Sequence, residues 1–257
     1  MSAHPTPGFR LAELNRDELR SIAQSGGVAI IPIAATEQHG PHLPAGTDTI
    51  STDQVVAEAA ESLAGRVPVV VSPILPYGCS AHHLPFGATA SLSPQTMLAV
   101  LLDLGGSLIV SGFTKILFVN GHGGNHSIMQ VAANELSQRH QVAVAAASWW
   151  HLAEEELIAH GALKRGDLPG HAGAFETSIM LALNPELVRD PASARPWTGP
   201  GRVGLKAPLT MRQPDDWAAI DGFTDRPSQA DAAFGEAYLK LGAAAVASAV
   251  ERLAARS

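Results

Sequence analysis

The chain lacks the residues on which several classes of protein depend. It has one cysteine, Cys79, among 257 residues, which excludes an internal disulfide framework and any cysteine-built zinc site. A bound metal would therefore need His, Asp and Glu ligands. Runs of lysine or arginine are also missing, and 24 acidic residues outnumber 17 basic ones, so we expect no binding to nucleic acid.

Long hydrophobic runs are absent as well. No stretch approaches the roughly 18 uninterrupted apolar residues that span a bilayer, and residues 1–20 have no apolar core of the signal-peptide type. We therefore expect no membrane contact and a cytoplasmic location. Hydrophobic residues nevertheless make up 46% of the chain, which is enough for a substantial buried core.

Short apolar runs alternate with helical patterns along the sequence. The runs at 26–34, 67–75, 115–120 and 141–148 are bounded by glycine or polar residues, which is typical of buried parallel strands. This alternation predicts an α/β fold with a mostly parallel sheet and helices on both faces. We expect residues 1–257 to form a single domain.

Helix starts can be located from capping residues. Ser51 with Gln54 resembles a capping box and predicts a helix that begins there. Further helices are predicted to begin after Ser93, after Asn125 and near Ser228.

Residues 184–227 differ from the rest of the chain. They are rich in Pro, Gly, Trp and Asp and show little periodicity, so we interpret them as an irregular excursion within the domain. A loop of this length in a compact domain is usually functional or part of an assembly surface.

Potential metal ligands follow the predicted strands. In an open parallel sheet the carboxyl ends of the strands point to one edge, so loops that are distant in sequence can form one site there. Four candidates follow the first strand, one follows the third, and two lie in a later glycine-containing segment: Glu37, His39, His42, Asp48, His122, His171 and Glu176.

These residue types favour a site for two metal ions. Imidazole and carboxylate ligands without thiolate suit Zn²⁺ or Mn²⁺, with Fe²⁺ also possible, and a carboxylate can bind two ions at once. Glu37 and His39 are two positions apart in an extended segment, so their side chains project to the same face and could each reach one ion. Asp48 is the natural bridge between the ions.

Three motifs, in this order, resemble the signature of the creatininase (creatinine amidohydrolase) family. They are EQHGPHLPAGTD at 37–48, NGHGGN at 120–125 and HAGAFETS at 171–178, and HHLPFGATASLS at 82–93 resembles a further segment. The resemblance covers about 26–247. It implies a three-layer α/β/α fold, a dinuclear metal centre, hydrolysis of carbon–nitrogen bonds in small amides, and a homo-oligomer, often a hexamer.

The resemblance also implies roles for individual residues. Glu37 and His122 resemble ligands of one ion, His39 resembles a ligand of the other, and Asp48 resembles the bridge. His171 resembles the catalytic histidine of the family.

Two positions depart from the family pattern. Gly124 stands where creatininases that act on creatinine have the glutamate of GHYEN, which would bind the second ion. We hypothesise that Glu176 fills this place and so belongs, with His171, to the catalytic set. Ala174 stands where many relatives have the first glutamate of HAGEFETS, which makes creatinine itself a less favoured substrate.

We therefore expect a metal-dependent amidohydrolase that acts on a small, possibly cyclic, amide. A water held between two divalent ions has a strongly lowered pKa and would attack the carbonyl, while His171 donates a proton to the leaving nitrogen.

Other functions within the resemblance stay open. They are a peptidase that trims a modified peptide, a hydrolase of a keto-inositol ring, a non-catalytic metal- or ligand-binding protein, and a formamide hydrolase acting on a pyrimidine nucleotide intermediate. Only Arg202, Lys206 and Arg212 are obvious partners for the phosphate of such a nucleotide.

Several further residues have more than one interpretation. His42 could support a metal ligand, His82 and His83 could line a pocket or lie on the surface, and Trp149 and Trp150 could form a pocket wall, core or subunit contact. We interpret Gln38 as a turn residue. The sequence GPGRVG at 199–204 formally matches a dinucleotide-binding fingerprint, but it follows no predicted strand and is not expected to bind a nucleotide.

Overall fold

The computed structural model describes residues 8–191 and 215–256. In this part of the chain four parallel strands form a sheet in the order β2-β1-β3-β4. All four predicted strands are confirmed, with shorter bounds at three of them: β1 (Val28–Ile33), β2 (Val69–Val71), β3 (Lys115–Asn120) and β4 (Ala143–Ser148).

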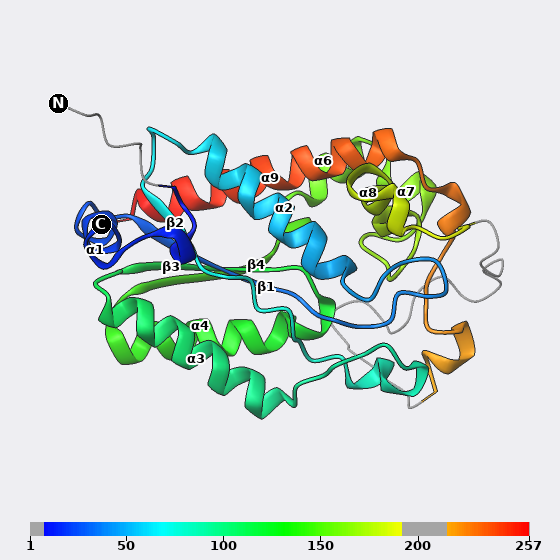
Figure 1. Ribbon diagram of the computed structural model, residues 1–257, viewed down its shortest axis with the longest axis horizontal. Helices are drawn as coiled ribbons and strands as arrows, with labels where there is room; N and C mark the ends of the chain where they lie inside the picture. Colours follow the sequence, from blue (N-terminus) through cyan, green and yellow to red (C-terminus); the bar gives the residue numbers. More distant parts are fainter. Residues whose placement is uncertain (1–7, 192–214, 257) are drawn as a thin grey trace.

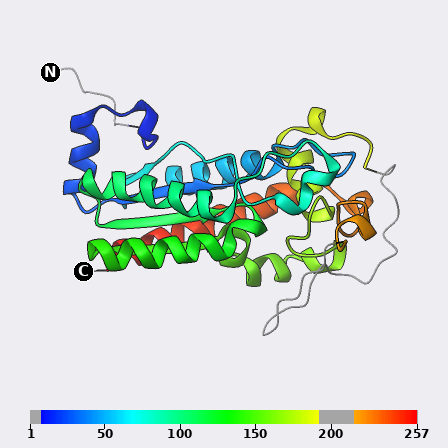
Figure 2. The same ribbon diagram turned by 90° about the horizontal axis from the view of Figure 1, so that it is seen from below.

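Helices cover both faces of this sheet, as the sequence predicts. In the view of Figure 1, α2 and α9 lie above the sheet and α3 and α4 below it, and Figure 2 views the protein from the side of α3 and α4. The α-helices are α1 (Arg16–Gln24), α2 (Thr47–Ser62), α3 (Pro94–Val110), α4 (His126–His140), α5 (Trp149–Leu152), α6 (Glu154–Ala159), α7 (Ala162–Arg165), α8 (Ala174–Leu183) and α9 (Ala232–Ala254).

The alternation of side chains along the strands builds two hydrophobic cores. On β1, Val28 and Ile30 pack into the core shared with α2, α8 and α9, whereas Ile31 and Ile33 pack into the core shared with α3 and α4. Each fully buried apolar side chain of this size contributes about 1.5–3 kcal/mol. Burial on both faces explains why β1 is a continuous apolar run.

The starts of three predicted helices are close to those observed, and one is wrong. Ser93 caps α3, α4 begins directly after Asn125, and α9 begins at Ala232 behind the capping residue Asp231. The helix expected at Ser51 instead begins at Thr47, one turn earlier. The Ser51 hydroxyl donates to the carbonyl of Asp48 within the helix and caps nothing.

The loops that follow the strands gather at one end of the molecule, on the right in Figure 1. Short 3-10 helices lie before α1, after β2 and β3, and between α8 and α9: η1 (Leu11–Glu13), η2 (Ala81–Phe86), η3 (Gly123–Asn125), η4 (Pro185–Leu187), η5 (Ala218–Ile220) and η6 (Pro227–Gln229). Within the described part of the chain, no helix has both the length and the apolar composition to cross a membrane.

Candidate metal centre

The predicted site residues come together at this end of the sheet. Five of them line one open cleft of about 700 Å³: Glu37, Asp48, His122, His171 and Glu176. They come from the loop after β1, the first turn of α2, the segment after β3, and the segment before and within α8.

Glu37, Asp48 and His122 form the first ligand cluster. Their donor atoms lie within 4.8 Å of one another. His122 Nδ1 lies 3.1 Å from Glu37 Oε1 and 3.3 Å from Asp48 Oδ2. We call this group cluster 1.

His39, Asp48 and Glu176 form a second group of the same size, which we call cluster 2. His39 Nε2 lies 3.1 Å from Asp48 Oδ1 and 3.6 Å from Glu176 Oε2. Asp48 belongs to both clusters and turns one oxygen to each of them. This is the arrangement of a carboxylate that bridges two ions.

The hydrogen bonds of the two histidines direct the other ring nitrogen of each into a cluster. His39 Nδ1 lies 3.0 Å from the carbonyl of Glu37, and His122 Nε2 lies 3.2 Å from the carbonyl of Cys79. A carbonyl can only accept, so these ring nitrogens carry the protons. Metal-binding histidines usually hold their distal N–H in this way.

The carboxylates and the imidazoles of the two clusters shift one another's pKa values. Burial by itself would lower the pKa of His39, but the Asp48 carboxylate, with Glu176, raises it to about 10. Glu37 and Asp48 likewise outweigh burial and raise the pKa of His122 well above its usual value. Burial would raise the pKa of Glu37, yet the charges of the histidines, above all His122, hold it well below its usual value.

The residues fit a divalent cation for a second reason. Both carboxylate oxygens of Glu37 and Oδ2 of Asp48 are buried and accept no hydrogen bond of regular geometry among the described residues, although Nδ1 of His122 faces two of them. Buried carboxylates in this state are costly unless a cation faces them, and a metal ion can take the place of the His122 proton. The same oxygens belong to the clusters defined above.

Zn²⁺ binding to the metal-free protein at pH 7 is expected to release protons. A histidine with a pKa of about 10 is protonated at this pH, whereas a ligand nitrogen must be bare. The release should therefore diminish as the pH rises through 10. Titration calorimetry in two buffers of different ionisation enthalpy measures it directly. An enthalpy that is independent of the buffer would contradict this protonation state of His39.

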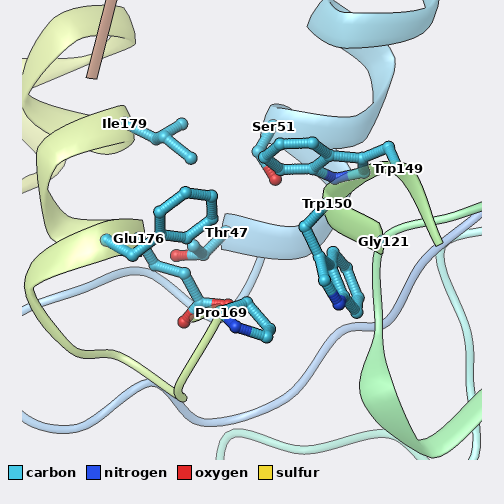
Figure 3. Close-up of a pocket in the computed structure, with 9 residues that line it drawn as sticks. Thr47, Ser51, Gly121, Trp149, Trp150, Pro169, Glu176 and Ile179 are labelled. Carbon is cyan, nitrogen blue, oxygen red and sulfur yellow. The ribbon is translucent and has the colours of Figure 1, made fainter. Parts of the chain in front are cut away.

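Glu176 reaches cluster 2 from the first turn of α8. Its Oε2 accepts a hydrogen bond of 2.5 Å from the Ala172 amide, and burial raises the pKa of the carboxyl to about 8. Figure 3 shows Glu176 and Trp150 on opposite sides of a small recess next to Gly121. The glutamate that is absent at Gly124 could not return without a backbone shift, because a Cβ there would overlap the carbonyl of Cys79 and the His122 ring.

The loop before α8 carries His171 and is fixed by a pair of residues that the sequence did not reveal. Thr224 Oγ1 accepts a 2.7 Å hydrogen bond from the amide of His171. The buried Asp225 carboxylate accepts from the amides of Asp167 and Ala174, at 3.1 Å and 2.8 Å. Both partners lie in the predicted irregular excursion.

The structure separates the residues that the sequence left ambiguous. His42 is buried and donates to the carbonyl of Ala172, 2.9 Å away, so it supports the His171 loop. His82 and His83 both line the cleft. Trp149 packs in the core against Phe175.

Trp150 and two residues that the sequence analysis missed complete the neighbourhood. Trp150 and Trp217 both line the cleft. The ring centroid of Trp217 lies 4.5 Å from that of His83 and 5.2 Å from that of His171. Gln38, interpreted as a turn residue, is buried and contacts His83 and His171. The three basic candidates Arg202, Lys206 and Arg212 and the segment 199–204 lie outside the described residues.

The fold and the site define a three-layer α/β protein with a candidate metal site, lined by histidines and carboxylates, at the carboxyl edge of its sheet. Residues 12–250 match the creatininase family model, which is described as creatinine amidohydrolase, and the chain belongs to this family of hydrolases.

Several relatives with different activities are similar to the chain. The mycofactocin precursor peptide peptidase of Mycobacterium tuberculosis H37Rv is 32% identical over 240 residues, which cover 88% of this chain and 84% of the relative. Creatinine amidohydrolase of Pseudomonas putida is 29% identical over 184 residues, covering 65% of this chain and 68% of that protein. A 3-dehydro-scyllo-inosose hydrolase of Thermotoga maritima is 26% identical over 185 residues, covering 70% of this chain and 58% of the hydrolase.

Solved structures of creatininase share the fold. One of them superimposes with a TM-score of 0.80 and 25% identity, covering 98% of this chain and 100% of the creatininase. Related creatininase structures are a Zn-Zn form of a mutant enzyme and an Mn form.

Proposed function

We propose that the protein hydrolyses a carbon–nitrogen bond of an amide with the help of two divalent ions, Zn²⁺ or Mn²⁺. Glu37, Asp48 and His122 would hold one ion, and His39, Asp48 and Glu176 would hold the other. The observation that carries this proposal is that Asp48 belongs to both clusters through different oxygens.

The ions would supply two kinds of chemistry, since they lower the pKa of a bound water and polarise the carbonyl of the substrate. The protein's own groups hold the ligands and move the proton. Asn120 supports the site by accepting from the amide of His122 at 3.0 Å and by donating to its carbonyl at 2.7 Å. The turn that carries His122 is therefore held rigid.

His171 is placed to move the proton. Its Nε2 lies 2.9 Å from the carbonyl of Gln38 and donates to it, which leaves Nδ1 bare and 3.5 Å from Glu37 Oε1. Burial lowers the pKa of His171 well below its usual value, so the ring is neutral at pH 7. In the proposed reaction the water oxygen bonds to the carbonyl carbon, its proton passes to Nδ1, and the same proton reaches the leaving nitrogen as the carbon–nitrogen bond breaks.

The favoured substrate is a small, possibly cyclic, amide, and a peptide is the second candidate. The peptide is kept as a candidate because the cleft has a volume of about 700 Å³ and the chain is similar to a peptide peptidase. Among the described lining residues there is no Lys or Arg, which weakens the case for a nucleotide phosphate.

The experiment is a hydrolysis screen of the protein loaded with Zn²⁺ and, separately, Mn²⁺. The panel contains creatinine, lactams, formamides, a keto-inositol and short peptides with varied C-termini. His171→Ala is expected to lower kcat on any active substrate about 10²–10⁴-fold while both ions stay bound, because the ring moves a proton and binds no metal.

His160→Ala is the matched control, since His160 packs against Phe234 and Tyr238 and is not among the residues that line the cleft. Loss of metal from His171→Ala would make His171 a ligand, in a third group whose donor atoms, from Glu37, His39 and His171, also lie within 4.8 Å of one another. A metal-loaded protein inert towards the whole panel would favour the non-catalytic alternative.

A further inference from the structure

The side chain of Gln38 has one orientation that satisfies its surroundings. Its Oε1 accepts a 2.9 Å hydrogen bond from the amide of Gly40. Its Nε2 lies 2.5 Å from the carbonyl of Gly222 and donates one of its two protons there. A flipped amide would place an oxygen against a carbonyl and a nitrogen against an N–H, so the orientation is determined by two independent partners.

The second proton of Gln38 Nε2 goes to His83. Nδ1 of His83 lies 2.8 Å from Gln38 Nε2, whereas Nε2 of His171 lies 3.2 Å away and already donates to the Gln38 carbonyl. An amide nitrogen has no lone pair to accept, so His83 Nδ1 must be the acceptor. The proton of the neutral His83 ring therefore lies on Nε2.

His83 Nε2 points towards the ligand clusters. It lies 3.8 Å from Glu37 Oε1. His171 Nδ1 lies 3.5 Å from the same oxygen. The two rings stack with centroids 4.2 Å apart and both line the cleft. His83 thus offers its Nε2–H to the cleft, whereas His171 offers its bare Nδ1.

We propose that Gln38 fixes both rings as Nε2–H tautomers, so that His83 donates a hydrogen bond to the substrate carbonyl oxygen while His171 accepts the proton of the attacking water. This inference rests on the proposed function and adds His83 as a catalytic residue and Gln38 as a positioning residue. A neutral donor aimed at the oxygen on which charge develops stabilises the transition state more than the ground state.

The environment of His83 supports this role. The ring is 1% exposed, and its Nδ1 accepts from Gln38, so a single proton on Nε2 satisfies it. Trp217 packs edge-on against the same ring. Because the packing and the Gln38 hydrogen bond fix the neutral imidazole, its N–H already has the required orientation, and no reorganisation energy is spent during the reaction.

The test is the tautomer of each ring, read from long-range ¹H–¹⁵N NMR spectra of the full chain with ¹⁵N-labelled histidine. Spectra are recorded without metal and with Zn²⁺, and His83→Phe and His171→Ala identify the two sets of signals. Both rings are expected as neutral Nε2–H forms in both samples. A proton on Nδ1 of His83 in the wild-type protein would overturn the proposal.

Two variants of Gln38 separate its effect on the two rings. Gln38→Glu replaces the donating amide by an accepting carboxylate, so His83 should switch to the Nδ1–H form. His171 should stay in the Nε2–H form, because its partner is the backbone carbonyl of residue 38. Gln38→Met, which neither donates nor accepts, should leave His83 as a mixture of forms, and Gln138→Glu on the exposed side of α4 should change neither ring.

Turnover of the best substrate from the panel tests the catalytic part. Loss of one such donor costs about 10²–10³-fold in kcat, and His83→Phe and Gln38→Glu should both show this loss with little change in KM. A wild-type kcat in His83→Phe, or an unchanged His83 tautomer in both Gln38 variants, would refute the inference. Metal content is measured on the same samples, so two bound ions with the wrong tautomers would refute the inference and leave the proposed function standing.

Discussion

Asp48→Ala is expected to remove both metal ions from the protein. Asp48 Oδ1 lies 3.1 Å from the ring of His39 in cluster 2, and Oδ2 lies 3.3 Å from the ring of His122 in cluster 1. No other carboxylate belongs to both clusters among the described residues. Plasma mass spectrometry should therefore find about two ions per chain in the wild-type protein and almost none in the variant.

Two further variants in α2 each remove one negative charge, the first at the same position and the second at a position outside the clusters. Asp48→Asn preserves the shape of the side chain and should lose the ions as well, because a neutral amide is a poor bridge. Asp53→Ala removes a carboxylate further along α2 that pairs with Arg10 and is 42% exposed, and it should retain both ions. Retention of two ions by Asp48→Ala would contradict the bridging role.

Glu176→Gln is expected to remove one ion and leave the other. Glu176 belongs only to cluster 2, where it lies 3.6 Å from His39, and Gly124 offers no side chain to replace it. Cluster 1 keeps all three of its ligands. The metal content should fall from about two ions per chain to about one. Turnover should fall with it, because one ion would have to both activate the water and polarise the substrate carbonyl, which two ions would share.

The matched control is Glu186→Gln, just beyond the end of α8, where the side chain is exposed. It should keep both ions and full turnover. If Glu176→Gln retained two ions and full activity, Glu176 would act only as a partner of the Ala172 amide and of the helix dipole, and it would have no place in the metal centre.

Most of the fold could be predicted because its strongest signals are local. β1 and β3 are buried on both faces, so their sequences are continuous apolar runs, and the helices after Ser93 and Asn125 have clear starts. The start of α2 was misplaced because Gly46 at its N-cap makes no side-chain hydrogen bond, whereas Ser51 within it resembles a cap. Cytoplasmic location and homo-oligomeric assembly stay predictions.

The gathering of the candidate ligands was predictable for a different reason. Glu37, His39 and Asp48 lie close together in sequence, and the carboxyl edge of a parallel sheet gives them a place to meet His122. Supporting residues carry no such local signal. Gln38 contacts residues 45, 133 and 184 positions away, and the Asp225 carboxylate becomes recognisable only when it accepts the amide of Ala174, 51 positions away.

The measurement that tests the central claim most directly is anomalous X-ray diffraction from crystals of the zinc-loaded protein, collected on both sides of the zinc absorption edge. Two peaks a few ångströms apart are predicted, one between Glu37, Asp48 and His122 and the other between His39, Asp48 and Glu176, with Asp48 between them. A single peak would contradict the two-ion site. Peaks away from Asp48 would contradict the proposed metal centre altogether.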